Sequence, residues 1–214
     1  MRVVAVPVKP LSRAKTRLAS ALTPLERGAL TLAMLEDVLD ATLQVAGWQT
    51  WVVSPDEVAL EIAARRGAGP VPESKPPLSG AIRQVEALAL EQDADALAIL
   101  PADLPLVTPD ALHEAFHTLG SVVLARSGEG TGTSLLLRRP PRAIPARFGP
   151  DSFRRHFELA AERGLPVSVV ERRELSFDLD RPDDILTLLA EGRTGRTREV
   201  CLNMDLAKRL RIHA

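Results

Sequence analysis

Asp103 stands in a setting that suits ligand chemistry. It follows an unbroken apolar run, residues 96–100, and lies between Pro101 and Pro105. Such a short apolar run is typical of a strand buried on both faces of a parallel sheet, and ligands bind beyond the carboxyl ends of those strands. The prolines restrict the backbone, so the carboxylate is held stiffly and suits a hard cation such as Mg²⁺. An aspartate that caps the next turn fits these residues equally well.

A cationic segment follows the first expected strand. Residues 2–8 are rich in β-branched side chains and predict a buried strand. The next ten residues, 9–18, hold four cations and no acid, which favours a site for a triphosphate over a solvated basic turn. This segment contains no glycine. Side chains such as Lys15 and Arg17, rather than backbone N–H groups, therefore have to supply the positive charge.

Two further carboxylates lie late in the chain. We expect a strand over residues 175–180, whose period of two places Asp178 and Asp180 on the same face. Neighbouring carboxylates repel each other unless a cation or an arginine lies between them. Asp183 and Asp184 fall in the first turn of the next expected helix, where the helix dipole favours acids, and we interpret them as structural.

Three more segments have alternative interpretations. In residues 76–82, Ser79 is a candidate helix N-cap and Gly80 leaves space for a flat ligand, although a plain proline-rich loop fits as well. Residues 127–134 are rich in glycine and hydroxyl groups that can bind an anion, but they lack the lysine of a phosphate loop. Residues 147–152 open a helix and form either an anion site or only a cap.

Strands alternate with helices along nearly all 214 residues, which predicts an α/β fold with a mostly parallel, doubly wound sheet. We expect a single domain, 1–214, with residues 191–214 forming a polar loop and one amphipathic C-terminal helix. If the cationic segment, Asp103 and the late acids meet at one edge of this sheet, they form a Mg²⁺–triphosphate site. Phosphoryl or nucleotidyl transfer needs little beyond such positioned charge.

Composition excludes several other classes. A net charge of −1 gives no basic surface for nucleic acid, and no apolar run is long enough to span a membrane. A single cysteine, Cys201, excludes an internal disulfide and fits a reducing cytoplasm. The histidines form no zinc spacing with it, and no nucleophile elbow of a hydrolase is present. The four histidines are His113, His117, His156 and His213.

Six motifs in unchanged order together resemble the 2-phospho-L-lactate guanylyltransferase family, which includes phosphoenolpyruvate guanylyltransferases. They are residues 6–9, 14–18, 100–105, 132–134, 147–152 and 177–182. The resemblance extends from the start to about residue 190. In the broader nucleotidyltransferase superfamily the first loop is a glycine-rich segment that ends in Thr-Arg-Leu. This chain keeps Thr16-Arg17-Leu18 but has Lys15 in place of the glycine, as this family does.

The resemblance implies a Rossmann-like three-layer domain of the nucleotide-diphospho-sugar transferase type. It also implies transfer of GMP from GTP to the phosphate of phosphoenolpyruvate or 2-phospho-L-lactate, with release of pyrophosphate, in the biosynthesis of the deazaflavin coenzyme F-420. The alternatives are a related transferase for a molybdopterin or sugar phosphate, and a nucleotide-binding module without turnover. We expect a cytoplasmic monomer or homodimer.

The resemblance also assigns roles to individual residues. Lys15, Arg17 and Asp103 are the implied catalytic residues, and the triphosphate is implied to lie near Lys9, Lys15 and Arg17. The guanine base is implied to lie near Leu78, Ser79 and Gly80, and the acceptor near Thr133, Gly149 and Ser152. Asp103, Asp178 and Asp180 are the implied Mg²⁺ ligands.

Overall fold

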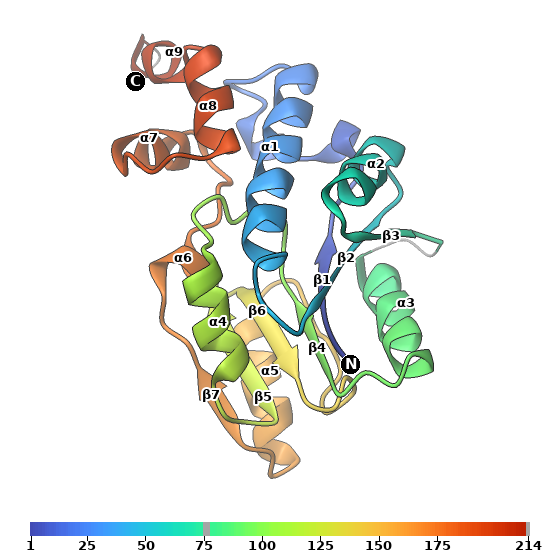
Figure 1. The fold of residues 1–214 in the computed structure, drawn as a ribbon. Coiled ribbons are helices and arrows are strands. Elements are labelled where there is room, and N and C mark those ends of the chain that lie inside the picture. The colour runs from blue at the N-terminus through green and yellow to red at the C-terminus, as the bar shows by residue number, and fades with distance from the viewer. Residues whose placement is uncertain (75–77, 213–214) are drawn as a thin grey trace.

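The computed structural model describes residues 1–74 and 78–212, and in them the strands form one seven-stranded sheet (Figure 1). The strand order is β3-β2-β1-β4-β6-β5-β7, and only β6 runs antiparallel to its neighbours. The strands are β1 (Arg2–Pro7), β2 (Gln49–Ser54), β3 (Gly69–Pro72), β4 (Ala96–Ile99), β5 (Val122–Arg126), β6 (Thr133–Arg138) and β7 (Val167–Val169). The predicted mostly parallel α/β sheet is confirmed.

The central strands are buried because helices cover both faces of the sheet. Val4 and Val6 of β1 pack into a cluster with α1, α2 and α4, whereas Val3 and Ala5 face the opposite way, toward α3. Helix α5 packs on β5 and β6, also on that second face. Figure 1 shows α1, α2 and α4 on the near face of the sheet and α5 behind it. These helices are α1 (Pro24–Thr42), α2 (Glu57–Arg66), α3 (Leu78–Glu91), α4 (Pro109–His117) and α5 (Ser152–Glu162).

Local signals explain where several helices begin. Thr23 and Glu26 form a capping box at the start of α1, with Pro24 at the first helical position. Thr108 caps α4 in the same position relative to Pro109. Ser79, in contrast, lies inside α3 and is not its N-cap. No helix among the described residues is both long and apolar enough to cross a lipid bilayer.

The predicted strand over residues 175–180 is wrong. A single helical turn, α6 (Arg173–Ser176), ends there, and residues 177–180 have no regular secondary structure. Leu175 packs in the hydrophobic cluster between the sheet and helices α1, α2 and α4. Phe177 and Leu179 pack in a different cluster, with the C-terminal helices. The alternating apolar residues therefore serve two separate cores, and the segment crosses the end of the sheet without joining it.

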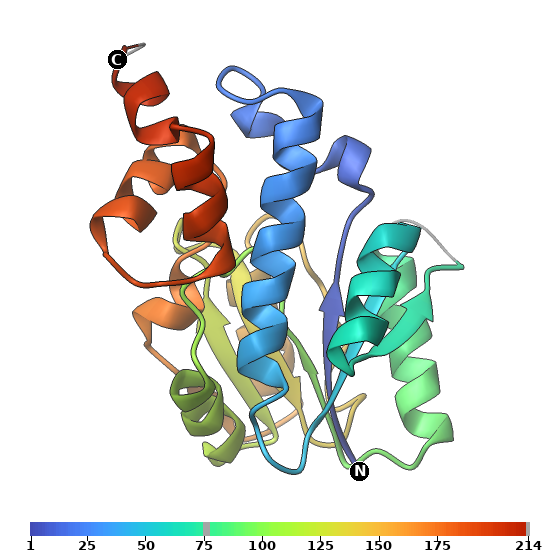
Figure 2. The same ribbon diagram turned by 45° about the horizontal axis from the view of Figure 1, so that its top comes forward.

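The C-terminal segment contains two helices where the sequence predicted one. After α7 (Pro182–Ala190), the chain forms α8 (Arg196–Asn203) and α9 (Leu206–Ile212). Asp205, with a φ of 51°, makes the break between them. These helices share a hydrophobic cluster with α1, and Figure 2 shows them beside the upper half of α1. They enclose the loop that carries Asp178 and Asp180 from one side.

Candidate active site

A cavity of about 450 Å³ lies at one edge of the sheet. The carboxyl ends of β1 and β4 open into it, and β6 begins there because it runs in the opposite direction. The ligand-binding edge predicted for the strand before Asp103 is therefore a real cavity. It is lined by ten of the twelve residues to which the sequence assigned roles: Lys9, Lys15, Arg17, Leu78, Asp103, Thr133, Gly149, Ser152, Asp178 and Asp180.

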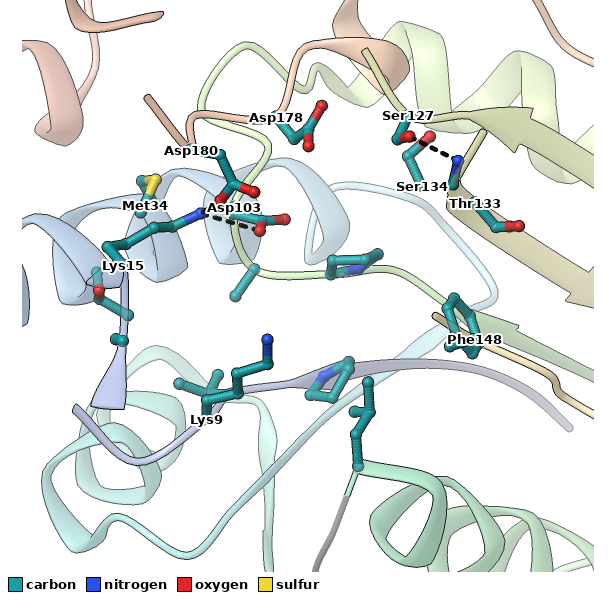
Figure 3. A pocket seen from close by; sticks show the side chains of 18 of the residues that line it. Lys9, Lys15, Met34, Asp103, Ser127, Thr133, Ser134, Phe148, Asp178 and Asp180 are labelled. Atoms are coloured by element: carbon teal, nitrogen blue, oxygen red, sulfur yellow. Dashed lines mark hydrogen bonds and ion pairs between the residues drawn. The ribbon is translucent and has the colours of Figure 1, made fainter. Parts of the chain in front are cut away.

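Lys15 joins two of the three aspartates. Its ammonium nitrogen Nζ lies 2.9 Å from Asp103 Oδ2 and 2.7 Å from Asp180 Oδ1 (Figure 3), and its side chain is only 7% exposed. Burial alone lowers the pKa of this ammonium, but the two carboxylates outweigh burial and raise the pKa above its ordinary value. Lys15 is therefore a fixed positive charge in the site.

The backbone at Lys15 is strained. Its φ and ψ of 49° and 46° lie in the left-handed region, which costs a residue with a side chain about 1 kcal/mol. The strain lies between two single 3₁₀ turns, Leu11–Arg13 and Thr16–Leu18. The two ion pairs with Asp103 and Asp180 offset this cost and hold the lysine in place.

Asp178 is the third acid of the cavity, and Lys15 does not contact it. Its Oδ1 accepts a hydrogen bond of 2.8 Å from the backbone N–H of Gly128. A Cβ on Gly128 would come within 2.9 Å of that oxygen, so a glycine is required for this approach. Burial and the nearby charges of Asp103 and Asp180 raise the pKa of Asp178, against the opposing effect of that N–H.

Backbone contacts position the two late aspartates. The N–H of Leu179 donates to the carbonyl of Asp103 at 3.0 Å, which ties the loop directly to the end of β4. The carboxylate of Asp184, at the start of α7, accepts from the N–H groups of Asp180 and Arg181 at 2.8 and 2.6 Å. The structural role predicted for Asp184 is confirmed.

Arg17 closes the acidic side of the cavity toward solvent. Its Nη1 lies 3.4 Å from Asp180 Oδ2 and 3.1 Å from Glu129 Oε1, and its side chain is 55% exposed. Although burial raises the pKa of Asp180, Lys15, Arg17 and the charge of Lys9 outweigh it and lower the pKa below its ordinary value. Lys9 is exposed, and Figure 3 shows its ammonium pointing into the cavity from the wall opposite Asp103.

The opposite end of the cavity presents hydroxyl and backbone groups. Thr133 begins β6, and Ser152 begins α5 with its N–H donating to the carbonyl of Gly149 at 3.1 Å. Gly149 has a φ of 112°, a conformation that favours glycine. The N–H of Phe153 donates to Thr131, so α5 is fastened to the glycine-rich loop before β6. The three residues predicted for the acceptor therefore line one part of the cavity together.

The side predicted for the guanine base is only partly assembled. Leu78 lines the cavity, and Ile82, one turn later on α3, lines it too. Ser79 and Gly80 are not among the described residues that form its wall, so their predicted contact with the base stays a prediction. Pro76 and Pro77, from the same motif, lie outside the described residues.

Comparison with known proteins identifies the family. The family described as "Guanylyl transferase CofC like" matches residues 1–210. The chain belongs to this family of guanylyltransferases. It is 41% identical over 190 residues to a phosphoenolpyruvate guanylyltransferase from Rubrobacter xylanophilus, an alignment that covers 87% of this chain and 93% of the relative. It is 35% identical over 196 residues to a 2-phospho-L-lactate guanylyltransferase from Methanothermobacter thermautotrophicus, covering 91% and 86%.

The fold agrees with that family. A crystal structure from Desulfovibrio desulfuricans, named for a nucleotide-diphospho-sugar transferase, superposes with a TM-score of 0.78. The alignment covers 99% of this chain and 98% of that one at 16% identity. The expected nucleotidyltransferase fold is therefore confirmed, as is the resemblance to the guanylyltransferases.

The acids of this guanylyltransferase cavity fit a hard divalent cation in their chemistry. They are carboxylates, the ligands that such a cation prefers. Burial and the nearby charges of Asp103 and Asp180 raise the pKa of Asp178, and no ammonium among the described residues pairs with it. The residues described form no ready group of three acidic, histidine or cysteine side chains around a vacant ion position. Lys15 lies between Asp103 and Asp180 instead, so an ion on these acids has to compete with an ammonium.

Sequence reasoning gave no role to His156, which the structure places behind the acceptor end of the guanylyltransferase cavity. Its ring is fully buried and bonds to Thr133 and to the backbone of Arg147. Its only sequence signal is its position one turn after Ser152 on the buried face of the expected helix. A histidine there is indistinguishable from a packed one without the fold.

Proposed function

We propose that this protein transfers GMP from GTP to the phosphate of a phosphorylated three-carbon acid and releases pyrophosphate. One observation carries the proposal: a single cavity joins the cationic segment, the three aspartates and the hydroxyl groups of Thr133 and Ser152. Such an arrangement places positive charge, acids and acceptor-binding groups around one reacting centre. The names of the relatives support guanine as the base and a phosphorylated acid as the acceptor.

In this proposal an oxygen of the acceptor phosphate attacks the α-phosphorus of GTP. A new bond forms between that oxygen and the α-phosphorus, and the bond from the α-phosphorus to the bridging oxygen of the β-phosphate breaks. Pyrophosphate leaves with the electron pair, so no protein nucleophile and no covalent intermediate are needed. Lys9, Lys15 and Arg17 offset the charge of the triphosphate, and Thr133 and Ser152 hold the acceptor in line.

Asp103, Asp178 and Asp180 are the residues that would hold Mg²⁺. When bound, Mg²⁺ neutralises charge on the phosphate oxygens. Asp103 and Asp180 have Lys15 as their partner in the free protein, and a cation held by these acids would leave the lysine free to bind phosphate. The ion pairs with Lys15 reduce the repulsion between Asp103 and Asp180 in the free protein.

Phosphoenolpyruvate and 2-phospho-L-lactate are the two acceptors that we propose, each in a pathway to coenzyme F-420. Both carry a phosphate and a carboxylate on adjacent carbons, and they differ in saturation at two carbons. Thr133, Gly149 and Ser152 offer hydroxyl and backbone groups to these shared anions. In 3-phospho-D-glycerate the two anions lie one carbon further apart, so it tests the spacing of this end of the cavity.

The test is to incubate the purified protein with GTP, Mg²⁺ and, in separate reactions, each of the three acids or a sugar phosphate, and to measure pyrophosphate release and product mass. We expect a guanylylated acid from phosphoenolpyruvate or 2-phospho-L-lactate, and at least about tenfold less turnover when ATP replaces GTP. Turnover with 3-phospho-D-glycerate alone would show that this acid, and neither of the two proposed acids, is the acceptor. Turnover only with a sugar phosphate, or none with any phosphorylated acceptor, would overturn the proposal.

A further inference from the structure

Both ring nitrogens of His156 are engaged on the wall behind the acceptor end of the cavity. The backbone N–H of Arg147 lies 2.7 Å from Nε2, and Thr133 Oγ1 lies 3.0 Å from Nδ1. The residue is 0% exposed. The imidazole therefore connects α5, the start of β6 and the loop before α5, the three elements that carry the predicted acceptor residues.

The two contacts decide which nitrogen carries the proton. A backbone N–H can only donate, so Nε2 must accept through its lone pair and carries no hydrogen. Burial, together with the charges of Arg138 and Arg155, lowers the pKa of His156 to about 3. The ring is therefore neutral near pH 7, and its one proton lies on Nδ1.

This tautomer sets the direction of the bond to Thr133. Nδ1 donates, so Thr133 Oγ1 accepts, and the hydroxyl proton of Thr133 has to find another acceptor. Within the described part of the chain the hydroxyl makes no other hydrogen bond. Since Thr133 lines the cavity, that proton is available to a ligand oxygen, which replaces solvent as its acceptor when the ligand binds.

We propose that His156 is a positioning residue that fixes the Thr133 hydroxyl as a hydrogen-bond donor to an anionic oxygen of the acceptor. The proposal rests on the proposed function, because it takes the ligand at this end of the cavity to be the phosphorylated acid. A hydroxyl that is free to rotate can donate or accept, whereas one that already accepts from His156 is committed to donate. A committed donor favours the phosphate or carboxylate oxygens of the acid over groups that are themselves donors.

The same ring also fixes the neighbouring loop. The N–H of Arg147 is bound to it, and the ring of Phe148 meets it edge-on with centroids 5.3 Å apart and planes at 70°. Phe148 lines the cavity beside Thr133 (Figure 3), and Gly149 follows it directly. One buried side chain thus links the hydroxyl of Thr133 to the backbone that presents Gly149.

The tautomer can be tested directly by long-range ¹H–¹⁵N correlation spectra of the full-length protein with labelled histidine. The His156→Gln spectrum assigns the signal of His156. We expect a neutral ring with hydrogen on Nδ1 and none on Nε2, unchanged between pH 8 and pH 5. A hydrogen on Nε2, or a ring that titrates near pH 6.5, would overturn the proposal.

Two variants at position 156 separate the two contacts. The amide of Asn reaches about as far as Nδ1 and can still donate to Thr133, whereas the amide of Gln reaches toward the position of Nε2 and can accept only from Arg147. We expect His156→Gln to raise the KM for the phosphorylated acid about tenfold, with the KM for GTP unchanged. His156→Asn should keep the KM for the acid within about threefold of the wild type.

Thr133→Val completes a double-mutant cycle with His156→Gln. It should raise the KM for the acid as much as His156→Gln does, and the double variant should show no further increase. Additive effects, or equal changes in the KM values of both substrates, would show that His156 only supports the fold. If the wild type turns over none of the acids, the proposed function fails, and the spectrum alone still decides the orientation of the Thr133 hydroxyl. If His156→Gln does not fold, the spectra of His113→Gln, His117→Gln and His213→Gln assign the other three rings, and the remaining signal belongs to His156.

Discussion

At the scale of single residues, Lys15 has two competing partners. In the free protein its ammonium is paired with Asp103 and Asp180, yet the proposed reaction needs the lysine at a triphosphate and the acids at a cation. The left-handed backbone at Lys15 indicates that the surrounding contacts impose this placement. The lysine thus serves as the counter-ion of the acids until substrate supplies other charges.

Competition of this kind predicts that Lys15→Met binds a divalent cation more tightly than the wild type. Methionine has a similar length but no charge, so the ion no longer has to displace an ammonium from Asp103 and Asp180. We expect about a tenfold gain in affinity for Mn²⁺ by titration calorimetry without nucleotide. Lys208→Met is the control, since Lys208 is exposed on α9, lies outside the cavity lining and makes no ion pair in the described structure, and it should change the affinity little. Weaker binding by Lys15→Met would show that the acids are not the ligands.

Asp103→Asn separates chemistry from folding. The substitution keeps the backbone carbonyl that accepts from Leu179, so the loop with Asp178 stays attached to the sheet. It removes the charge that faces Lys15 and the proposed cation, and we expect turnover to fall at least about 100-fold. Circular dichroism and pyrophosphate release measure the two effects. Asp110→Asn, at an exposed position on α4, is the matched control and should keep full activity.

At the scale of elements, the sequence predicts strands and helices where their signals are local. The apolar run that predicts β4 and the β-branched run that predicts β1 depend on neighbouring residues only, and both predictions are confirmed. The segment 175–180 shows where local signals fail. Its apolar residues alternate as in a strand, but Leu175 and Leu179 pack into different clusters, which only the assembled fold determines.

The candidate site shows the same division. The placement of Asp103 beyond a buried strand follows from the sequence because strand ends and prolines are local features. The reversed direction of β6, which brings Thr133 to the same edge, depends on strand pairing with β4 and β5. The contacts of His156 and the ion pairs of Lys15 join residues far apart in the chain, so no spacing within the sequence indicates them.

One long-range element contact gives a stability prediction. Asp37 on α1 caps the N-terminus of α8. Its Oδ1 accepts from the N–H of Arg196 at 2.7 Å, and its Oδ2 accepts from the N–H of Thr197 at 2.9 Å. Asp37→Ala leaves these donors without a partner, and we expect a loss of about 1–2 kcal/mol in the free energy of unfolding by urea. Glu199→Ala, an exposed site on the same helix, should change it by less than about 0.5 kcal/mol. Equal losses in both variants would rule out a cap by Asp37.

At the scale of the whole molecule, burial of His156 makes global stability depend on pH. The folded protein holds this ring neutral, with a pKa of about 3, while the unfolded chain has the ordinary value of about 6.5. Between these values the unfolded state binds a proton that the folded state excludes. The contribution is therefore fully present above about pH 6.5 and is lost progressively as the pH falls toward 3.

The expected loss is roughly 1.4 kcal/mol for each pH unit below about 6.5, or about 2 kcal/mol at pH 5. Urea unfolding of the wild type and His156→Gln at pH 7 and pH 5 measures it. The variant lacks the titrating ring but keeps every other group. Its free energy of unfolding minus that of the wild type should therefore rise by about 2 kcal/mol between pH 7 and pH 5. The carboxyl groups and the other three histidines are present in both proteins, so their titration cancels in the comparison. A difference between the two proteins that is the same at both pH values would mean that the folded state accepts the proton on His156, and the fixed direction of its bond to Thr133 would be lost with it.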